Sequence, residues 1–402
     1  MDTILGNRQG LRVLVAGSTL QLFLGIIYAW SVFVRPVSEF YTWDIEQVKL
    51  TSSFMLCCFV IGILAGGKLQ LKIGASNVAL IGGVMLALGM LATAFIPLGW
   101  YTWILYVTYG IIGGFGVGVG YSANIASAQK WFPKHRGFAA GVCVCAFGFS
   151  TVIFAPLVEW LIGQFGLRQT FVVLAGGFLI VVLALFRFIR LPDDSGTGSA
   201  AAAQLPEKKQ YLTNEMLRTR SFYFITLSLM LGTAAFFILM PSLKTLAAER
   251  GLDKEIATVL VMISGVANAL GRLGVPLLSD KIGRERAALT VLVLTMLGAV
   301  SLCFVQGFMF VAVVAVIAFC FGGYSGVYPV MTADYFGVRH IGANYGAVMI
   351  GFATSALVVP MVISQIHNET AKFIVLAALA TLGATLVLIL LHAKKNISPG
   401  RG

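Results

Sequence analysis

Charged residues are scarce in this sequence. Asp, Glu, Lys and Arg make up 11% of the 402 residues, whereas hydrophobic residues make up 58%. A soluble protein of this size needs more charge to cover its surface, so the composition excludes a water-soluble globular fold and favours a protein surrounded by lipid. Only four histidines occur, in loops or near helix ends, and none has metal-ligand spacing. We therefore expect no metal site and no cofactor.

Cysteine is also sparse, and its placement excludes a disulfide framework. All six cysteines fall inside apolar segments, where they behave as small hydrophobic residues. A cleavable leader is not expected either, because the short polar segment Met1–Gly10 runs directly into a long apolar stretch without a small-residue cleavage site. We expect this segment to remain as a cytoplasmic tail.

Long apolar runs dominate the remainder of the chain. About 20 apolar residues are needed for a helix to cross the hydrocarbon layer, and twelve runs reach that length. Most of the loops between them are short, so consecutive helices should be antiparallel neighbours. The sequence predicts an all-α membrane protein with twelve transmembrane helices. The predicted spans are 11–34, 48–70, 77–97, 101–128, 138–163, 169–188, 222–246, 256–278, 287–306, 309–333, 343–366 and 371–393.

The positive charges predict the orientation in the membrane. With both termini on one face, that face collects 20 of the 28 Lys and Arg residues and the opposite face collects 7. Cytoplasmic loops carry the excess of positive charge, so we expect both termini in the cytoplasm of a multi-pass protein of the cell (inner) membrane. The remaining cation, Arg272, lies inside an apolar span.

One long polar stretch, 191–220, reads as a flexible linker. It divides a six-helix bundle at 1–190 from a second at 221–402. Similar loops recur across the divide: Gly66–Gly74 and Pro276–Arg284 are offset by 209 residues from Gly74 to Gly283, and a second pair is offset by 204 from Trp131 to Tyr335. Basic loops at these positions could follow from topology alone. The shared Lys-x-Gly favours a duplicated bundle with a binding site between the halves.

Arg272 is the most informative single residue. An arginine in mid-membrane costs roughly 2.5–3.5 kcal/mol, so it should face a cavity and have a use. Its planar guanidinium matches a carboxylate through two parallel hydrogen bonds. Asn268 lies four residues earlier on the same helix face, where its amide could orient the guanidinium or touch a ligand. The structural alternative is a permanent pair with an Asp or Glu of another helix, or with helix-end carbonyls.

The loop after the eighth helix resembles the inter-helix signature of the major facilitator superfamily. Asp280, Lys281, Gly283 and Arg284 occupy the signature positions, whereas the first copy has Leu71 for the Asp and Ala75 for the last basic residue. The resemblance implies two six-helix bundles. It also implies a gating role for Asp280, Lys281 and Arg284, with Asp280 pairing with cations or a helix N-terminus on the cytoplasmic side.

A closer resemblance covers nearly the whole chain and is to the bacterial oxalate/formate antiporter and monocarboxylate transporter group. It rests on Gly25–Trp30, Trp131-Phe132-Pro133, Arg272 with Ser279–Arg284, and Asp334–Gly337 with Asn344–Gly346. This resemblance implies that Arg272 binds a substrate carboxylate and that Tyr121 and Tyr28 face the substrate. Taken alone, such tyrosines more often serve packing. The glycines from 113 to 120 indicate close helix packing rather than binding.

The same alignment implies aromatic walls. Phe321 takes the place of a cavity tryptophan, and the shift of a partner tyrosine to Tyr324 leaves open which of the two faces inward. Phe352 stands where the oxalate transporter has a second cation. One cation and an apolar wall suit a small monocarboxylate such as L-lactate or pyruvate rather than a dicarboxylate.

Electroneutrality favours proton symport, because a monoanion entering a negative cell works against about 2.3 kcal/mol per 100 mV. The charged residues of 39–49 are titratable but read as a solvated loop, so no proton carrier is assigned. Exchange of carboxylates is the alternative mechanism, and a non-transporting carboxylate sensor or an enzyme fits less well. The expected partners are substrate, proton and lipid bilayer, with no nucleic acid and a monomeric protein.

Overall fold

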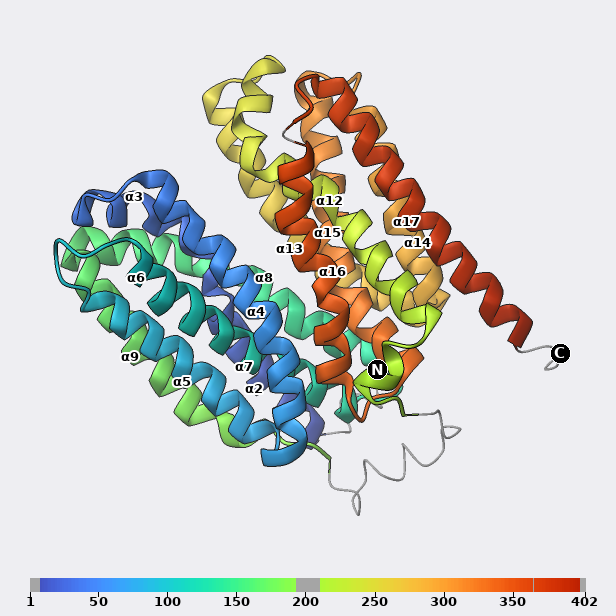
Figure 1. Cartoon of the computed structure of the whole chain (residues 1–402), viewed down its shortest axis with the longest axis horizontal. Coiled ribbons are helices and arrows are strands. Elements are labelled where there is room, and N and C mark those ends of the chain that lie inside the picture. Colours follow the sequence, from blue (N-terminus) through green and yellow to red (C-terminus); the bar gives the residue numbers. More distant parts are fainter. Residues whose placement is uncertain (1–7, 193–209, 364, 398–402) are drawn as a thin grey trace. The chain divides into compact units, whose positions relative to one another are not determined.

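The computed structural model of the chain describes residues 8–192, 210–363 and 365–397 (Figure 1). Every element that it contains in these residues is helical, which confirms the predicted fold class. Eleven of the helices are long and apolar enough to cross a membrane. Most of the predicted linker, 193–209, lies outside the described residues.

The predicted spans of the first half correspond to long helices, most of whose ends extend further into the loops than predicted, whereas α5 ends three residues early, at Ala94. The predicted span 48–70, for example, is a helix from Ile45 to Ile73. In chain order the elements are α2 (Arg8–Leu24), η1 (Gly25–Ala29), α3 (Trp30–Tyr41), α4 (Ile45–Ile73), α5 (Ala75–Ala94), α6 (Trp103–Leu105), η2 (Tyr106–Gly113), α7 (Gly114–Trp131), α8 (Arg136–Phe165), α9 (Leu167–Leu185) and η3 (Phe186–Phe188).

The second half contains α11 (Thr213–Met216), α12 (Arg220–Glu249), α13 (Lys254–Ile282), α14 (Arg284–Ser301), α15 (Gly307–Phe336), α16 (Ile341–Ile363) and α17 (Glu369–Ile397). The ninth predicted span, 287–306, largely coincides with α14. That helix has only 18 residues, and its first three, Arg284, Glu285 and Arg286, are charged. It is therefore not among the eleven candidate spans, and the count of twelve stays a prediction.

Two irregular segments interrupt helices of the first half. The first helix passes through a 3₁₀ segment, η1, between α2 and α3, and the fourth passes through the π-helix η2 between the short α6 and α7. Runs of π-helix are rare and often occur at functional sites. The corresponding helices of the second half, α12 and α15, are continuous α-helices.

The chain divides into two compact units. The first comprises Met1–Thr213 with Phe336–Ala347, and the second Asn214–Tyr335 with Val348–Gly402. Four hydrogen bonds tie Phe336–Ala347 to the end of the linker within the first unit. They run from Tyr211 N to Phe336 O at 3.0 Å, from Arg339 N to Gln210 Oε1 at 3.0 Å, from Asn344 Nδ2 to Tyr211 O at 3.0 Å and from Thr213 Oγ1 to Asn344 Oδ1 at 2.9 Å. The assignment of the two six-helix bundles to 1–190 and 221–402 remains a prediction.

The turns after α4 and α13 have the same backbone geometry. Gly74 has φ 82° and ψ 161°, and Gly283 has φ 94° and ψ 154°. Each glycine follows a 29-residue helix and donates its N–H to the carbonyl four residues back, that of Gln70 or Ser279. Glycine adopts positive φ without the steric penalty of a side chain, which explains why both loop copies contain it here.

Close helix contacts repeat at the offsets that the loops predict. In the first unit, a Cβ on Gly62 would collide with the carbonyl oxygen of Phe115, and one on Gly118 with that of Phe59. In the second, Gly271 stands in the same relation to Phe319, and Gly322 to Asn268. The offset from Gly62 to Gly271 is 209 residues and that from Gly118 to Gly322 is 204. The α4–α7 contact is therefore the counterpart of the α13–α15 contact.

We expect Gly118→Leu and Gly322→Leu to destabilise the protein, because each side chain would meet the backbone carbonyl of Phe59 or Asn268. Overpacking of this kind costs about 1–3 kcal/mol or more. Gly176→Leu is the matched control, since nothing lies within 4 Å of an added Cβ there. Thermal unfolding in detergent, followed by intrinsic fluorescence, should give lower Tm values for the first two variants only. Equal Tm values for all three would contradict the prediction.

Candidate functional site

Arg272 is buried in the middle of a candidate membrane span. It lies on α13, in the span Val259–Ile282, and only 2% of the residue is exposed. Asn268, one turn earlier and half-buried, accepts a hydrogen bond from Arg272 Nε at 2.9 Å. The structure thus brings together the two residues that the sequence paired on one helix face. The amide fixes the plane of the guanidinium.

The backbone beneath Arg272 is held against α15. A Cβ on Gly322 would meet Asn268 O and Arg272 N, and one on Gly326 would meet Arg272 O and the ring of Pro276. Small residues at such contacts let helix backbones approach closely in membranes. This turn of α13 is therefore positioned by backbone packing and not only by its side chains.

Phe321 and Phe352 meet in a cluster of four phenylalanines in the second unit. The Phe321 ring stacks on Phe236 at 3.7 Å between centroids, and lies 5.4 Å from Phe237 and 5.8 Å from Phe352. Phe237 also contacts Phe352, at 5.2 Å. The sequence analysis missed Phe236 and Phe237, because a Phe pair inside an apolar helix carries no distinguishing signal. Phe321 and Phe352 are 3% and 4% exposed, so the cluster forms a dry apolar surface.

Tyr324 has a different environment from Phe321. Its hydroxyl lies 2.7 Å from Thr295 Oγ1 and donates to Val291 O at 3.1 Å, both on α14. Tyr328, one turn later, donates to Ser228 Oγ on α12 at 2.9 Å. Both tyrosines are buried in the packing of the second unit. Of the two candidates, Phe321 therefore belongs to the aromatic cluster and Tyr324 to the contact between α14 and α15.

Tyr28 and Tyr121 are brought together in the first unit by Phe147. The centroid of Phe147 lies 5.3 Å from that of Tyr28 and 5.0 Å from that of Tyr121. Phe59 completes the group, 5.2 Å from Tyr121 and 5.9 Å from Phe147. Tyr28 belongs to the 3₁₀ segment η1 and is half-buried, whereas Tyr121 is 3% exposed on α7. The two phenylalanines were not identified from the sequence.

These two aromatic clusters follow the internal repeat. Phe147 on α8 corresponds to Phe352 on α16, since both lie eleven residues after the starts of their helices at Arg136 and Ile341. The first cluster carries two hydroxyl groups and the second carries none. Along α4, the position equivalent to Arg272 at the offset of 209 is Ile63, which is fully buried. Of these two equivalent positions, only Arg272 in the second unit carries a charge.

The predicted gating residues contribute to a charge network at the ends of α13, α14 and α15. Arg284 Nη1 lies 2.5 Å from Asp280 Oδ1 and 2.6 Å from Ser279 Oγ, and its Nε donates to Asp334 Oδ2 at 2.9 Å. Beside this network, the Tyr335 hydroxyl donates to Glu285 Oε1 at 2.9 Å. Asp280 thus pairs with a cation of its own unit. Lys281 is exposed.

Arg284 precedes the predicted ninth span and lies outside the candidate membrane spans. Its burial alone would lower the pKa of the guanidinium, but the Asp334 and Asp280 carboxylates raise that pKa above its usual value. A guanidinium is always charged in proteins, so this network keeps its cation at every pH of interest. Its strength depends on the ionisation of the two carboxylates.

The acidic residues near the end of the first helix form local contacts. Glu39 pairs with Arg35 at 2.7 Å and Glu46 with Lys49 at 2.6 Å, all four residues being largely exposed. Asp44 Oδ1 caps α4 by accepting from the N–H groups of Glu46 and Gln47. These contacts agree with a solvated loop. Among the described residues, no group of three or more His, Cys, Asp or Glu could hold a metal ion.

Comparison with known proteins extends over nearly the whole chain. The oxalate:formate antiporter of Oxalobacter formigenes is 26% identical over 361 residues, covering 88% of this chain and 84% of that protein. Monocarboxylate transporter 13 of Rattus norvegicus is 25% identical over 387 residues, covering 94% and 87% respectively. A structure of the Escherichia coli fucose:proton symporter FucP covers 95% of this chain and 99% of its own, with 13% identity and a TM-score of 0.70, and so shares the fold.

The family assignment follows from a match along most of the sequence. The sequence profile of the Major Facilitator Superfamily matches residues 15–360 and, in a second match, residues 234–400. The repeated helix contacts and the two units of the structure agree with the twin-bundle architecture of membrane transporters built by duplication. The chain therefore belongs to the Major Facilitator Superfamily of membrane transporters.

Proposed function

We propose that the protein is a secondary active transporter of small monocarboxylates, such as L-lactate or pyruvate, that works by proton symport with alternating access. The observation that carries this proposal is the buried guanidinium of Arg272 in the middle of a membrane span, oriented by Asn268. The relatives named as an oxalate:formate antiporter and a monocarboxylate transporter support the substrate class.

The chemistry of Arg272 fits a carboxylate ligand. Arg272 Nε donates to Asn268, and the planar guanidinium carries a fork of donors that matches the two oxygens of a carboxylate. A site of low dielectric strengthens this pairing. Binding of the anion neutralises the guanidinium and removes the cost of enclosing a charge, which provides a way for the substrate to drive closure.

The apolar cluster of Phe236, Phe237, Phe321 and Phe352 supports a short alkyl tail on that carboxylate. It belongs to the same unit as Arg272, and Gly322, next to Phe321, packs on the backbone of Asn268 and Arg272. Desolvating a second carboxylate among phenyl rings is costly, whereas a methyl group gains from burial. This arrangement favours lactate or pyruvate over oxalate.

Proton symport accounts for uptake against the membrane potential. A monoanion entering a negative cell works against about 2.3 kcal/mol per 100 mV, and a proton moving with it cancels that energy. Carboxylate exchange of the oxalate–formate type is the second candidate, and the oxalate:formate antiporter among the relatives favours it. A carboxylate sensor without transport belongs to another class and predicts binding without flux.

The remaining assignments are part of the same proposal. We propose that α14 is the twelfth span, that the bundles are 1–190 and 221–402 joined by 191–220, and that both termini lie in the cytoplasm of a monomer in the inner membrane. Tyr28, Tyr121 and Tyr324 support substrate binding in this scheme, Tyr324 indirectly by holding α15 against α14. Asp280, Lys281 and Arg284 act in gating.

Uptake into proteoliposomes tests the central assignment. With lactate outside at acidic pH and an alkaline interior, the wild type should accumulate lactate, and a protonophore should abolish accumulation. Arg272→Gln should reduce uptake by about 100-fold or more, because truncating a buried charge pair costs about 2–5 kcal/mol. Arg272→Lys keeps the charge but not the fork, so its uptake should be intermediate. Arg286→Gln, at an exposed residue, is the matched control and should transport normally.

Each result separates the candidates. Uptake that ignores the pH gradient but requires carboxylate inside the vesicle would replace symport by exchange. Oxalate moving faster than lactate, pyruvate and formate would overturn the monocarboxylate assignment. Normal lactate uptake by Arg272→Gln would remove the proposed role of the guanidinium.

Asn268→Ala should weaken lactate binding without stopping transport. The amide orients Arg272 through one hydrogen bond to a charged group, and such bonds contribute about 1.5–3 kcal/mol. We expect KM to rise by roughly tenfold to a hundredfold, with a smaller change in maximal rate. Asn77→Ala removes an exposed asparagine on α5 whose amide donates to Ile73 O at the end of α4, and should leave KM unchanged. A KM equal to wild type for Asn268→Ala would show that the guanidinium needs no such support.

Phe352→Lys should shift the preference from lactate towards oxalate. The added ammonium would place a second cation among Phe237 and Phe321, able to pair with a second carboxylate. Phe352→Leu keeps the wall apolar and should retain the preference for lactate. The ratio of lactate to oxalate uptake, measured in the same vesicle preparation, is the readout. An active Phe352→Lys protein with an unchanged ratio would argue against this wall as a determinant of specificity.

A further inference from the structure

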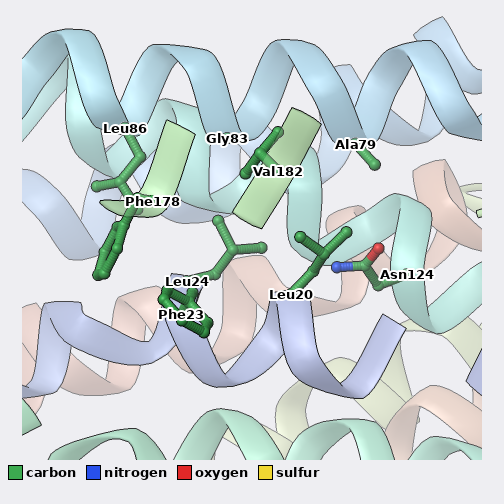
Figure 2. Close-up of a pocket in the computed structure, with 9 residues that line it drawn as sticks. All are labelled: Leu20, Phe23, Leu24, Ala79, Gly83, Leu86, Asn124, Phe178 and Val182. Carbon is green, nitrogen blue, oxygen red and sulfur yellow. The ribbon is translucent and has the colours of Figure 1, made fainter. Parts of the chain in front are cut away.

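A small cavity lies inside the first unit. It is enclosed by side chains of α2, α5, α7 and α9, including Leu20, Leu24, Leu86 and Phe178 (Figure 2). Its one polar lining residue is Asn124, whose amide Figure 2 shows beside Leu20. The space has room for about one water molecule.

The Asn124 side chain is buried without a protein partner. It is 1% exposed, and neither Oδ1 nor Nδ2 has a hydrogen bond to any residue that the structure describes. The same holds for Gln21 Oε1, whose amide nitrogen donates to Tyr121 O on α7, about one turn before Asn124. An unsatisfied buried polar group is destabilising, so these atoms require a ligand that both donates and accepts.

The internal repeat explains why the cavity exists. At the offset of 204 residues, Gly120 and Asn124 correspond to Tyr324 and Tyr328. In the first unit Gly120 contacts Leu24, and in the second unit Tyr324, the counterpart of Gly120, contacts Gly232. Leu24 and Gly232 are therefore equivalent, and equivalent residues of α2 and α12 are 208 positions apart. That offset makes Leu20 the counterpart of Ser228.

In the second unit the equivalent space is filled by protein. The Tyr324 and Tyr328 rings lie 6.2 Å apart in the core, and the Tyr328 hydroxyl donates to Ser228 Oγ. In the first unit, glycine and asparagine replace both rings, and Leu20 cannot form the hydrogen bond. The Asn124 amide therefore lies beside space that no ring fills, and it has no hydrogen-bonding partner among the described residues.

We infer that this cavity is a binding site for a single water molecule held by Asn124. Water is small enough for the space, accepts from Nδ2 and donates to Oδ1. A small apolar solute would leave the amide unpaired. A cation would need to lose its hydration in a cavity whose lining residues, all of which the structure describes, carry no charge.

Radiolytic hydroxyl-radical labelling with mass spectrometry tests this site, because radicals formed from an ordered buried water oxidise the side chains beside it. In the full-length protein in detergent, Phe178, only 2% exposed, should be labelled despite its burial. Tyr328 is the matched control, since it is fully buried in the equivalent and filled space of the second unit. Its labelling should stay at background although tyrosine is an intrinsically reactive side chain.

Two variants test the role of the amide. Asn124→Leu fills the space with an apolar side chain, and Asn124→Ala keeps the space but removes the amide; in both, Phe178 labelling should fall to the Tyr328 level. Asn124→Leu should also have a Tm at or above that of wild type, because it replaces the buried amide and the water that pairs with it by an apolar side chain. Phe178 labelling at background in the wild type, or labelling retained in Asn124→Ala, would overturn the inference.

Discussion

The interaction on which the functional interpretation depends is the hydrogen bond from Arg272 to Asn268 within one buried turn of α13. A guanidinium at this depth is expensive to keep, and its conformational freedom would make it a poor receptor for a small anion. The amide restricts it to one plane. The glycines of α15 hold the backbone below it, so both the charge and its support are set before a ligand arrives.

Duplication gives the two units the same framework and different interiors. Pairs of glycine and carbonyl recur at constant offsets between α4 and α7 and between α13 and α15, so the packing of these helices has been retained in both copies. The side chains have diverged on this common frame. Ile63 is the counterpart of Arg272 in the repeat, and the aromatic cluster around Phe147 carries two hydroxyl groups whereas that around Phe321 carries none.

Much of the fold could be predicted from the sequence, because lipid imposes long apolar runs and the loops carry a repeated glycine. Helix ends such as those of α4 lie within a few residues of the prediction, and the pairing of Asn268 with Arg272 follows from helical spacing alone. The partners of Phe321 could not be predicted, since apolar helices offer many phenylalanines with equivalent patterns and only packing selects Phe236. Likewise, the environment of Tyr324 depends on a hydroxyl at Thr295, 29 residues away.

The irregular segments η1 and η2 are points at which helices of the first unit can rotate about their axes. The continuous helices α12 and α15 of the second unit have no such points. Neighbouring residues of an α-helix are separated by about 100° around its axis. Inserting or removing a wide turn therefore rotates the whole helical segment that follows that turn about the helix axis. If the wide turn of η2 relaxes by one hydrogen-bond step, the face of α7 that carries Tyr121 swings around the axis without melting any of its turns. Tyr121 would then change its position relative to Phe147 on α8, whereas Phe236, Phe237 and Phe321 lie on the continuous helices α12 and α15.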